Sequence, residues 1–271
     1  MKLAKPIKVV VRGASGRVGR VMVDAMCREP GIQVAGATEL HVAEDYLSLP
    51  DKSGSVPFSS DLEYILTSCR PDVLVDFTVA QATMPAVRIA TKHGVNLVIG
   101  TTGLTSDDLG EIDKLALAHK VGAVVASNFA LGAVLMIHLA KIAAKYLDHA
   151  EIIELHHSLK VDAPSGTALS TARAMAAARG KPFQRPPSEQ KGTQPSRGEQ
   201  VEGVTIHSVR LPGLMAHQEV LLGGAGQTLS IRHDTINREC YVPGVILAVK
   251  EVVNRQGLVY GLDTLLGLSG G

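Results

Sequence analysis

Short apolar stretches alternate with segments of helical period along the first half of the chain. Strand-like stretches lie at 7–11, 33–38, 72–77, 96–99 and 122–126, and helical segments lie at 20–28, 81–93 and 107–119. Buried strands that are joined by helices are typical of a parallel sheet covered on both faces. The pattern predicts an α/β fold with a Rossmann-like, doubly wound parallel sheet.

The pattern changes after residue 128. A long apolar helical stretch at 130–146 is followed by strand-like stretches at 150–155, 204–211, 218–222 and 228–232, with a helix expected at 167–179. This order predicts an α+β domain with a mixed or antiparallel sheet. The segment 181–200 is rich in Pro, Gln, Ser, Gly and charge, which predicts a long irregular loop. A helix at 241–254 and an apolar segment at 258–268 are expected to rejoin the first domain, giving domains 1–128 with 238–271, and 129–237.

Composition excludes several classes of protein. The 271 residues carry a formal net charge of +1, and they include no Trp and only 3% aromatic residues, which argues against a nucleic-acid partner. No apolar stretch reaches membrane-spanning length, and the first six residues lack the apolar core of a secretory signal, so we expect a cytoplasmic location and no membrane partner. Cys27, Cys69 and Cys240 are far apart and odd in number, which favours buried thiols over a disulfide framework or a zinc site.

A glycine loop, Gly-Ala-Ser-Gly-Arg-Val-Gly at 13–19, joins the first strand to the first helix. Glycines at such a junction permit a tight turn and let the backbone approach a pyrophosphate at the helix N-terminus. The spacing is GxxGxxG rather than GxGxxG, and glycines also serve purely structural purposes there. Glu39 ends the second strand about twenty residues further on, where an acid accepts from the adenosine ribose hydroxyls. The alternative for Glu39 is an ordinary exposed loop acid.

Three further loops follow strands of the same domain, at 76–78, 100–103 and 127–129. The carboxyl ends of the strands form the edge at which open α/β sheets bind ligands. Each loop by itself is also compatible with a simple Asx or Ser/Thr turn. Their coincidence at one sheet edge favours a ligand site.

The segment 154–167, Glu-Leu-His-His-Ser-Leu-Lys-Val-Asp-Ala-Pro-Ser-Gly-Thr, carries the chemistry of the second domain. His156 and His157 can exchange protons near neutral pH, and Lys160 can hold a carboxylate or donate a proton. Gly166 and Thr167 begin a helix, whose free N–H groups attract an anion. Adjacent histidines on a strand point to opposite faces, so one at the surface and one as a satisfied polar group is the structural alternative. No further Cys, His or carboxylate follows at ligand spacing, and Asp162 is too close in sequence to judge, so we expect no metal.

These motifs resemble the 4-hydroxy-tetrahydrodipicolinate reductase family, also called dihydrodipicolinate reductase, over essentially the whole chain. The segment 154–167 is the most specific part of this resemblance. The family implies hydride transfer from NADH or NADPH to C4 of an unsaturated cyclic dicarboxylate with loss of water, in the diaminopimelate route to lysine. It also implies a homotetramer assembled through the sheets of the second domain, which would bind the substrate, while the first would bind the dinucleotide.

The resemblance also implies site residues. His156 would be the catalytic acid/base and Lys160 the proton donor, and His157, Lys160, Gly166 and Thr167 would hold the substrate carboxylates. Glu39 would hold the adenosine ribose. The pyrophosphate would be lined by Gly13, Ala14, Ser15, Gly16, Arg17 and Val18, and the nicotinamide end would be bordered by Gly100, Thr101, Thr102, Ala126, Ser127, Asn128 and Phe129.

One position departs from the family pattern. Some members follow the ribose-binding acid with an arginine that contacts a 2′-phosphate, whereas Leu40 follows Glu39 here and Arg17 keeps the other phosphate-contacting position. We therefore expect NADH to be used at least as well as NADPH. Two other functions stay open: another two-domain nicotinamide-dependent amino or keto acid dehydrogenase, and a non-catalytic dinucleotide sensor.

Overall fold

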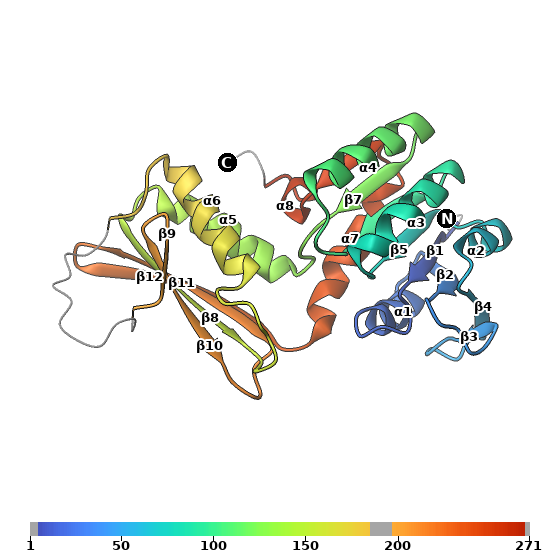
Figure 1. Cartoon of the computed structure of the whole chain (residues 1–271), viewed down its shortest axis with the longest axis horizontal. Helices are drawn as coiled ribbons and strands as arrows, with labels where there is room; N and C mark the ends of the chain where they lie inside the picture. The colour runs from blue at the N-terminus through green and yellow to red at the C-terminus, as the bar shows by residue number, and fades with distance from the viewer. Residues whose placement is uncertain (1–4, 185–196, 269–271) are drawn as a thin grey trace. The chain divides into compact units, whose positions relative to one another are not determined.

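The computed structural model describes residues 5–184 and 197–268, so most of the loop expected at 181–200 lies outside the described residues. The chain divides into two compact units (Figure 1). The first comprises the chain up to Leu131 and again from Tyr241, and the second comprises Gly132–Cys240. Each unit is built around its own sheet.

The first unit contains an eight-stranded sheet with the order β13-β7-β6-β5-β1-β2-β4-β3. All neighbouring strands are parallel except β3 and β4, which confirms the doubly wound parallel sheet. The strands are β1 (Ile7–Arg12), β2 (Ile32–Thr38), β3 (Tyr46–Ser48), β4 (Ser55–Ser59), β5 (Val73–Asp76), β6 (Asn96–Ile99), β7 (Gly122–Val125) and β13 (Gly257–Tyr260).

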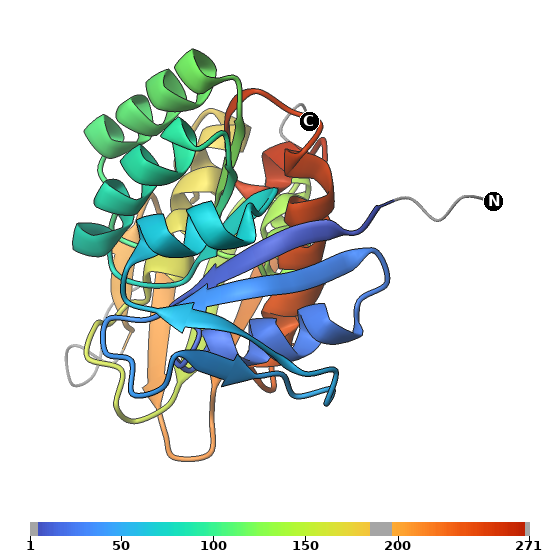
Figure 2. The same ribbon diagram turned by 90° about the vertical axis from the view of Figure 1, so that its right-hand side faces the viewer.

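Helices cover both faces of this sheet. Figures 1 and 2 show α2, α3 and α4 along one face, and α1 and α7 on the other. A short 3-10 helix, η1, precedes α7, and α8 follows β13. Their bounds are α1 (Gly19–Arg28), α2 (Leu62–Cys69), α3 (Ala80–Lys92), α4 (Ser106–His119), η1 (Arg238–Tyr241), α7 (Val242–Val252) and α8 (Leu262–Leu265).

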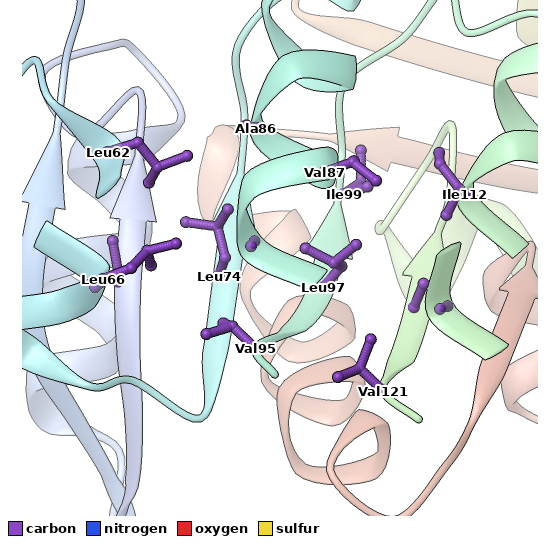
Figure 3. Packing of buried hydrophobic residues seen from close by; sticks show 14 of the residues in the cluster. Leu62, Leu66, Leu74, Ala86, Val87, Val95, Leu97, Ile99, Ile112 and Val121 are labelled. Carbon is purple, nitrogen blue, oxygen red and sulfur yellow. The ribbon is translucent and has the colours of Figure 1, made fainter. Parts of the chain in front are cut away.

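Apolar side chains fill the layer between the sheet and α2, α3 and α4 (Figure 3). Leu74 and Leu97 of the sheet meet Val87 of α3 and Leu66 of α2 in this cluster, and all four are almost fully buried. Burying one such side chain contributes roughly 1.5–3 kcal/mol. This core holds the strand ends of the first unit in a row, and the loops at those ends carry the residues expected to bind the dinucleotide.

The second unit contains a five-stranded mixed sheet with the order β12-β11-β8-β10-β9. Strands β8 and β10 are parallel and the other pairs are antiparallel, as the sequence predicts. Two helices, α5 and α6, lie on one face of this sheet (Figure 1). Their buried alanine and methionine side chains join the hydrophobic core of the unit. The bounds are α5 (Leu131–Ala144), β8 (His149–His156), α6 (Gly166–Arg179), β9 (Glu199–Val201), β10 (Val204–Arg210), β11 (Ala216–Gly224) and β12 (Gln227–Thr235).

The expected loop at 181–200 extends too far at its C-terminal end. Glu199 and Gln200 belong to β9, which pairs antiparallel with β10, and Gln200 Nε2 donates to Thr205 Oγ1 at 2.7 Å. Polar residues form a strand here because a neighbouring strand supplies the hydrogen bonds, so local composition underestimates strand content. None of the helices in the described residues is both long and apolar enough to span a membrane.

Candidate functional site

The glycine loop packs so tightly that side chains are excluded from two of its positions. Gly13 has φ +76°, and a Cβ atom on Gly19 would lie 2.0 Å from Gly13 O. Gly16 N donates to Gly13 O at 3.0 Å and closes the turn. The first turn of α1 therefore lies directly against the end of β1.

The start of α1 leaves backbone donors free. The N–H groups of Arg17, Val18 and Gly19 reach no acceptor in the part of the chain that the structure describes, and no side chain caps the helix. Such N–H groups, together with the positive end of the helix dipole, bind phosphate groups. The loop thus fits the pyrophosphate of a dinucleotide.

Glu39 lies beside this loop at the end of β2. Its Oε2 accepts from Ser15 N at 3.1 Å, and its Oε1 accepts from Leu40 N at 3.0 Å. Leu40 is 78% exposed, and Arg17 is also exposed. The acid is therefore placed at the loop, and the side chain that follows it on the chain is apolar and open to solvent.

A buried carboxylate joins the ends of three neighbouring strands. Asp76 ends β5, and its Oδ1 accepts from Thr78 N at 3.0 Å and from Thr78 Oγ1 at 2.6 Å. Arg12, at the end of β1, donates to Asp76 Oδ2 at 3.2 Å and to Thr78 Oγ1 at 2.7 Å. Thr101, after β6, donates to Asp76 Oδ1 at 3.4 Å. Sequence reasoning named the loop 76–78 without finding this network, and it did not single out Arg12.

The remaining residues of this edge differ in what they present. Phe129 is buried and packs edge-on against Phe77, with ring centroids 6.0 Å apart, so its side chain belongs to the core of this edge. A Cβ on Gly100 would lie 2.1 Å from Phe77 Cε1. The residues expected at this edge differ in exposure. Thr101 and Ala126 are buried, Asn128 is half-buried, and Thr102 and Ser127 are exposed.

In the second unit, a fully buried carboxylate meets the first histidine of the pair. Glu154 and His156 lie two residues apart on β8 and therefore on the same face of the sheet. The distance between His156 Nδ1 and Glu154 Oε2 is 2.5 Å. Glu154 is 0% exposed, and His156 is partly exposed. The histidine thus has a carboxylate behind one ring nitrogen.

Arg210 completes this arrangement from β10, where it lies opposite His156 in the register. Its two terminal nitrogens donate to Glu154 at 2.9 and 2.8 Å, and Nη2 also donates to Asp162 O at 2.6 Å. Burial alone would raise the pKa of Glu154, but hydrogen bonds from His156, Arg210 and Ser208 outweigh it and lower the pKa to about 2. Glu154 is therefore ionised at neutral pH.

Lys160 lies in the loop after β8. Its Nζ donates to both oxygens of Asp162, at 2.7 and 2.8 Å, and the hydrogen bond from Lys160 lowers the pKa of Asp162. His157, the second histidine, has a buried Nδ1 without a partner in the described part of the chain. The loop therefore holds one paired cation and one histidine nitrogen that still lacks a hydrogen bond.

The loop ends at the N-terminus of α6. Ser165 caps the helix by accepting from Ala168 N at 3.2 Å, and Ser165 N donates to Glu154 Oε1 at 3.2 Å. The N–H groups of Gly166 and Thr167 reach no acceptor within the described residues. A second helix start with free N–H groups thus lies next to the Glu154–His156 pair.

Two models of one family match the chain. The model described as "Dihydrodipicolinate reductase, N-terminus" matches residues 7–129, and the C-terminus model matches residues 132–266. The 4-hydroxy-tetrahydrodipicolinate reductase of Dehalococcoides mccartyi is 54% identical over 263 residues, covering 97% of this chain and 99% of that protein. The enzyme of the same name from Moorella thermoacetica is 50% identical over 262 residues, covering 96% and 98%.

A solved structure agrees with these relatives. The dipicolinate-bound dihydrodipicolinate reductase from Paenisporosarcina sp. TG-14 matches with a TM-score of 0.86 and 38% identity, covering 96% of this chain and 99% of that chain.

The doubly wound sheet and its glycine loop define a dinucleotide-binding domain, and the family that matches it is one of NAD(P)H-dependent reductases. The family models extend over almost all of the chain, and the relatives match it nearly end to end. The chain belongs to the dihydrodipicolinate reductase family. The reductase function, the enzyme class and the cofactor class expected from the sequence are thereby confirmed.

Proposed function

We propose that this chain reduces 4-hydroxy-tetrahydrodipicolinate to tetrahydrodipicolinate, with loss of water, through the residues described above. The observation that carries the proposal lies in the second unit. The ionised Glu154 carboxylate with its His156 partner, the Lys160 side chain and the open N-terminus of α6 are brought together within one short segment of chain. Proton-donating groups beside an anion site are what reduction of a cyclic dicarboxylate requires.

The first unit would hold the dinucleotide. The free N–H groups of Arg17, Val18 and Gly19 would donate to the pyrophosphate, and Glu39 would accept from the ribose hydroxyls. The loops at 100–102 and 126–129 would border the nicotinamide. When bound, the reduced nicotinamide supplies the hydride that goes to C4 of the substrate.

The second unit would hold and protonate the substrate. The Gly166 and Thr167 N–H groups would donate to one carboxylate, and Lys160 with His157 would bind the other. Lys160 Nζ would release its bond to Asp162 and deliver a proton, and His156 would exchange a proton through Nε2. A positive group near the electron density that a hydride adds to a conjugated imine lowers the barrier.

Assembly, location and cofactor preference stay predictions. We expect a homotetramer assembled through the sheet of the second unit, a cytoplasmic location, and use of NADH at least as well as NADPH. Light scattering coupled to size-exclusion chromatography would test the tetramer. The exposed, apolar side chain of Leu40 is the observation that favours NADH, because it has neither a positive charge nor a hydrogen-bond donor for a 2′-phosphate.

The test follows NADH and NADPH absorbance with purified protein and substrate made by condensing pyruvate with aspartate semialdehyde. We expect substrate-dependent oxidation, and we expect Lys160→Ala or His156→Ala to lower kcat by about a hundredfold to ten-thousandfold. Full turnover in both variants would contradict the residue assignment. Cofactor binding without oxidation would indicate a sensor, and oxidation with another keto acid alone would indicate a different dehydrogenase.

A further inference from the structure

We propose that Glu154 is a positioning residue for His156: the buried carboxylate fixes the proton on Nδ1 and so presents Nε2 as the nitrogen that exchanges protons at the substrate. The inference rests on the role proposed above for His156. It assigns a function to Glu154, a residue that is fully buried and therefore cannot contact the substrate itself.

Both oxygens of Glu154 are fully used. Oε2 lies 2.5 Å from His156 Nδ1 and accepts from Arg210 Nη1 at 2.9 Å. Oε1 accepts from Arg210 Nη2 at 2.8 Å and from Ser165 N at 3.2 Å. Two nitrogen partners on each oxygen leave the carboxylate little freedom to rotate or withdraw, so the ring nitrogen facing it has a fixed partner.

An ionised carboxylate can only accept hydrogen bonds, so the ring nitrogen that faces it must carry a hydrogen. In the neutral imidazole this places the single proton on Nδ1 and leaves the lone pair on Nε2. The polar side chains on the neighbouring elements either have partners of their own or carry no charge. Arg210 is bonded to Glu154 itself, Lys160 is bonded to Asp162, and Gln218, opposite Glu154 on β11, is neutral.

The same carboxylate also connects the histidine to the anion site. Ser165 donates its N–H to Glu154 and uses its hydroxyl to cap α6, so the strand that carries His156 is tied to the helix start that carries Gly166. Arg210 reaches from the carboxylate to Asp162 O in the intervening loop. Glu154 thereby holds in register the proton-transfer group and the groups proposed to grip the substrate.

A purely structural ion pair would also explain a buried Glu154–Arg210 contact, so the test must observe the ring itself. We would label the histidines with ¹⁵N and read the tautomer of His156 from its ring-nitrogen shifts in the wild type, Glu154→Gln and Glu154→Asp. The matched control is Glu151→Gln on the same strand, which removes a carboxylate from His207 Nε2 at 2.9 Å, outside the site. Steady-state kinetics with both substrates would accompany the spectra.

We expect the neutral ring of His156 in the wild type to carry its proton on Nδ1 and to lose this preference in Glu154→Gln. In the same variant kcat should fall by about a hundredfold to ten-thousandfold with an unchanged KM for the reduced cofactor, since the amide substitution in Ser-His-Asp triads costs a similar factor. Glu154→Asp should keep the tautomer and recover part of kcat. Glu151→Gln should alter only the His207 signals.

A wild-type ring with its proton on Nε2 would overturn the proposal, even if no variant folds. The same holds if a folded Glu154→Gln protein keeps both the wild-type tautomer and the wild-type kcat. Absence of reductase turnover in the wild type would instead contradict the proposed function, because the tautomer is measured without substrate.

Discussion

Glu154 should make the stability of the second unit sensitive to acid, and the size of this effect follows from the surroundings of the carboxyl group. The pKa of this carboxyl falls from 4.5 to about 2 on folding, because the hydrogen bonds from His156, Arg210 and Ser208 outweigh the cost of its burial. A folded-state pKa below the unfolded value stabilises the folded state above the unfolded pKa. That stabilisation is lost as pH falls from about 4.5 through about 2.

The magnitude follows from the linkage between pKa and stability. Each unit by which folding lowers the pKa is worth about 1.4 kcal/mol. Ionised Glu154 therefore contributes roughly 3 kcal/mol to the free energy of unfolding at neutral pH. Solvent screening does not reduce this figure much, since the side chain is fully buried. Glutamine has the shape of the protonated acid but cannot ionise. Glu154→Gln should therefore cost roughly 3 kcal/mol at pH 7 and almost nothing near pH 2.

Urea unfolding of the wild type and Glu154→Gln at several pH values from 7 down to 3 measures this difference. Other carboxylates titrate equally in both proteins, so their contributions cancel. Glu111→Gln is the control, because Glu111 pairs with Arg88 at the surface. Its plot of unfolding free energy against pH should run nearly parallel to that of the wild type. A stability difference for Glu154→Gln that stays constant over this pH range would refute the reasoning.

Three further substitutions test the two anion sites and the cofactor preference. Gly19→Ala places a methyl group against Gly13 O and should weaken NADH binding at least tenfold in a fluorescence titration, whereas Gly110→Ala, with open space around its Cβ, should not. Gly166→Pro removes one N–H at the first position of α6, where proline suits the helix, so KM for the substrate should rise while Gly166→Ala leaves it unchanged. Leu40→Arg adds a guanidinium at an exposed position and should raise kcat/KM for NADPH relative to NADH; an unchanged ratio would show that Leu40 does not set the preference.

The strand–helix alternation predicted the first unit well because both signals there are local. Buried parallel strands are continuous apolar stretches, and the segments at 72–77 and 96–99 contain β5 and β6. The region between β2 and β5 was left unassigned, although it contains β3, β4 and α2. Strands β3 and β4 are short and partly polar, so the pairing of β4 with β2 and of β3 with β4 decides their structure more than their own residues do.

The candidate site was predictable where its residues are adjacent in the sequence. The strand–glycine–helix order places Gly13 and Gly19 at a helix start, and the run from His156 to Thr167 lies in one segment. Arg12 and Asp76 contribute to a network across three strands, 64 residues apart in the chain. No local pattern marks such a pair, because only the sheet order brings β1 next to β5.

The Glu154–His156 pair was predictable from the sequence only in part. Residues two apart on a strand share a face, so the identity of the pair was available from the sequence once β8 was recognised. Its electrostatic state was not, because Arg210 comes from a strand 56 residues away and meets Glu154 through the parallel register of β8 and β10. That guanidinium is one of the hydrogen-bond donors that lower the pKa of Glu154 against its burial, and an ionised carboxylate can only accept from Nδ1. The chemistry proposed for His156 therefore depends on a non-local strand pairing, and a substitution on β10 should change the tautomer of a ring on β8.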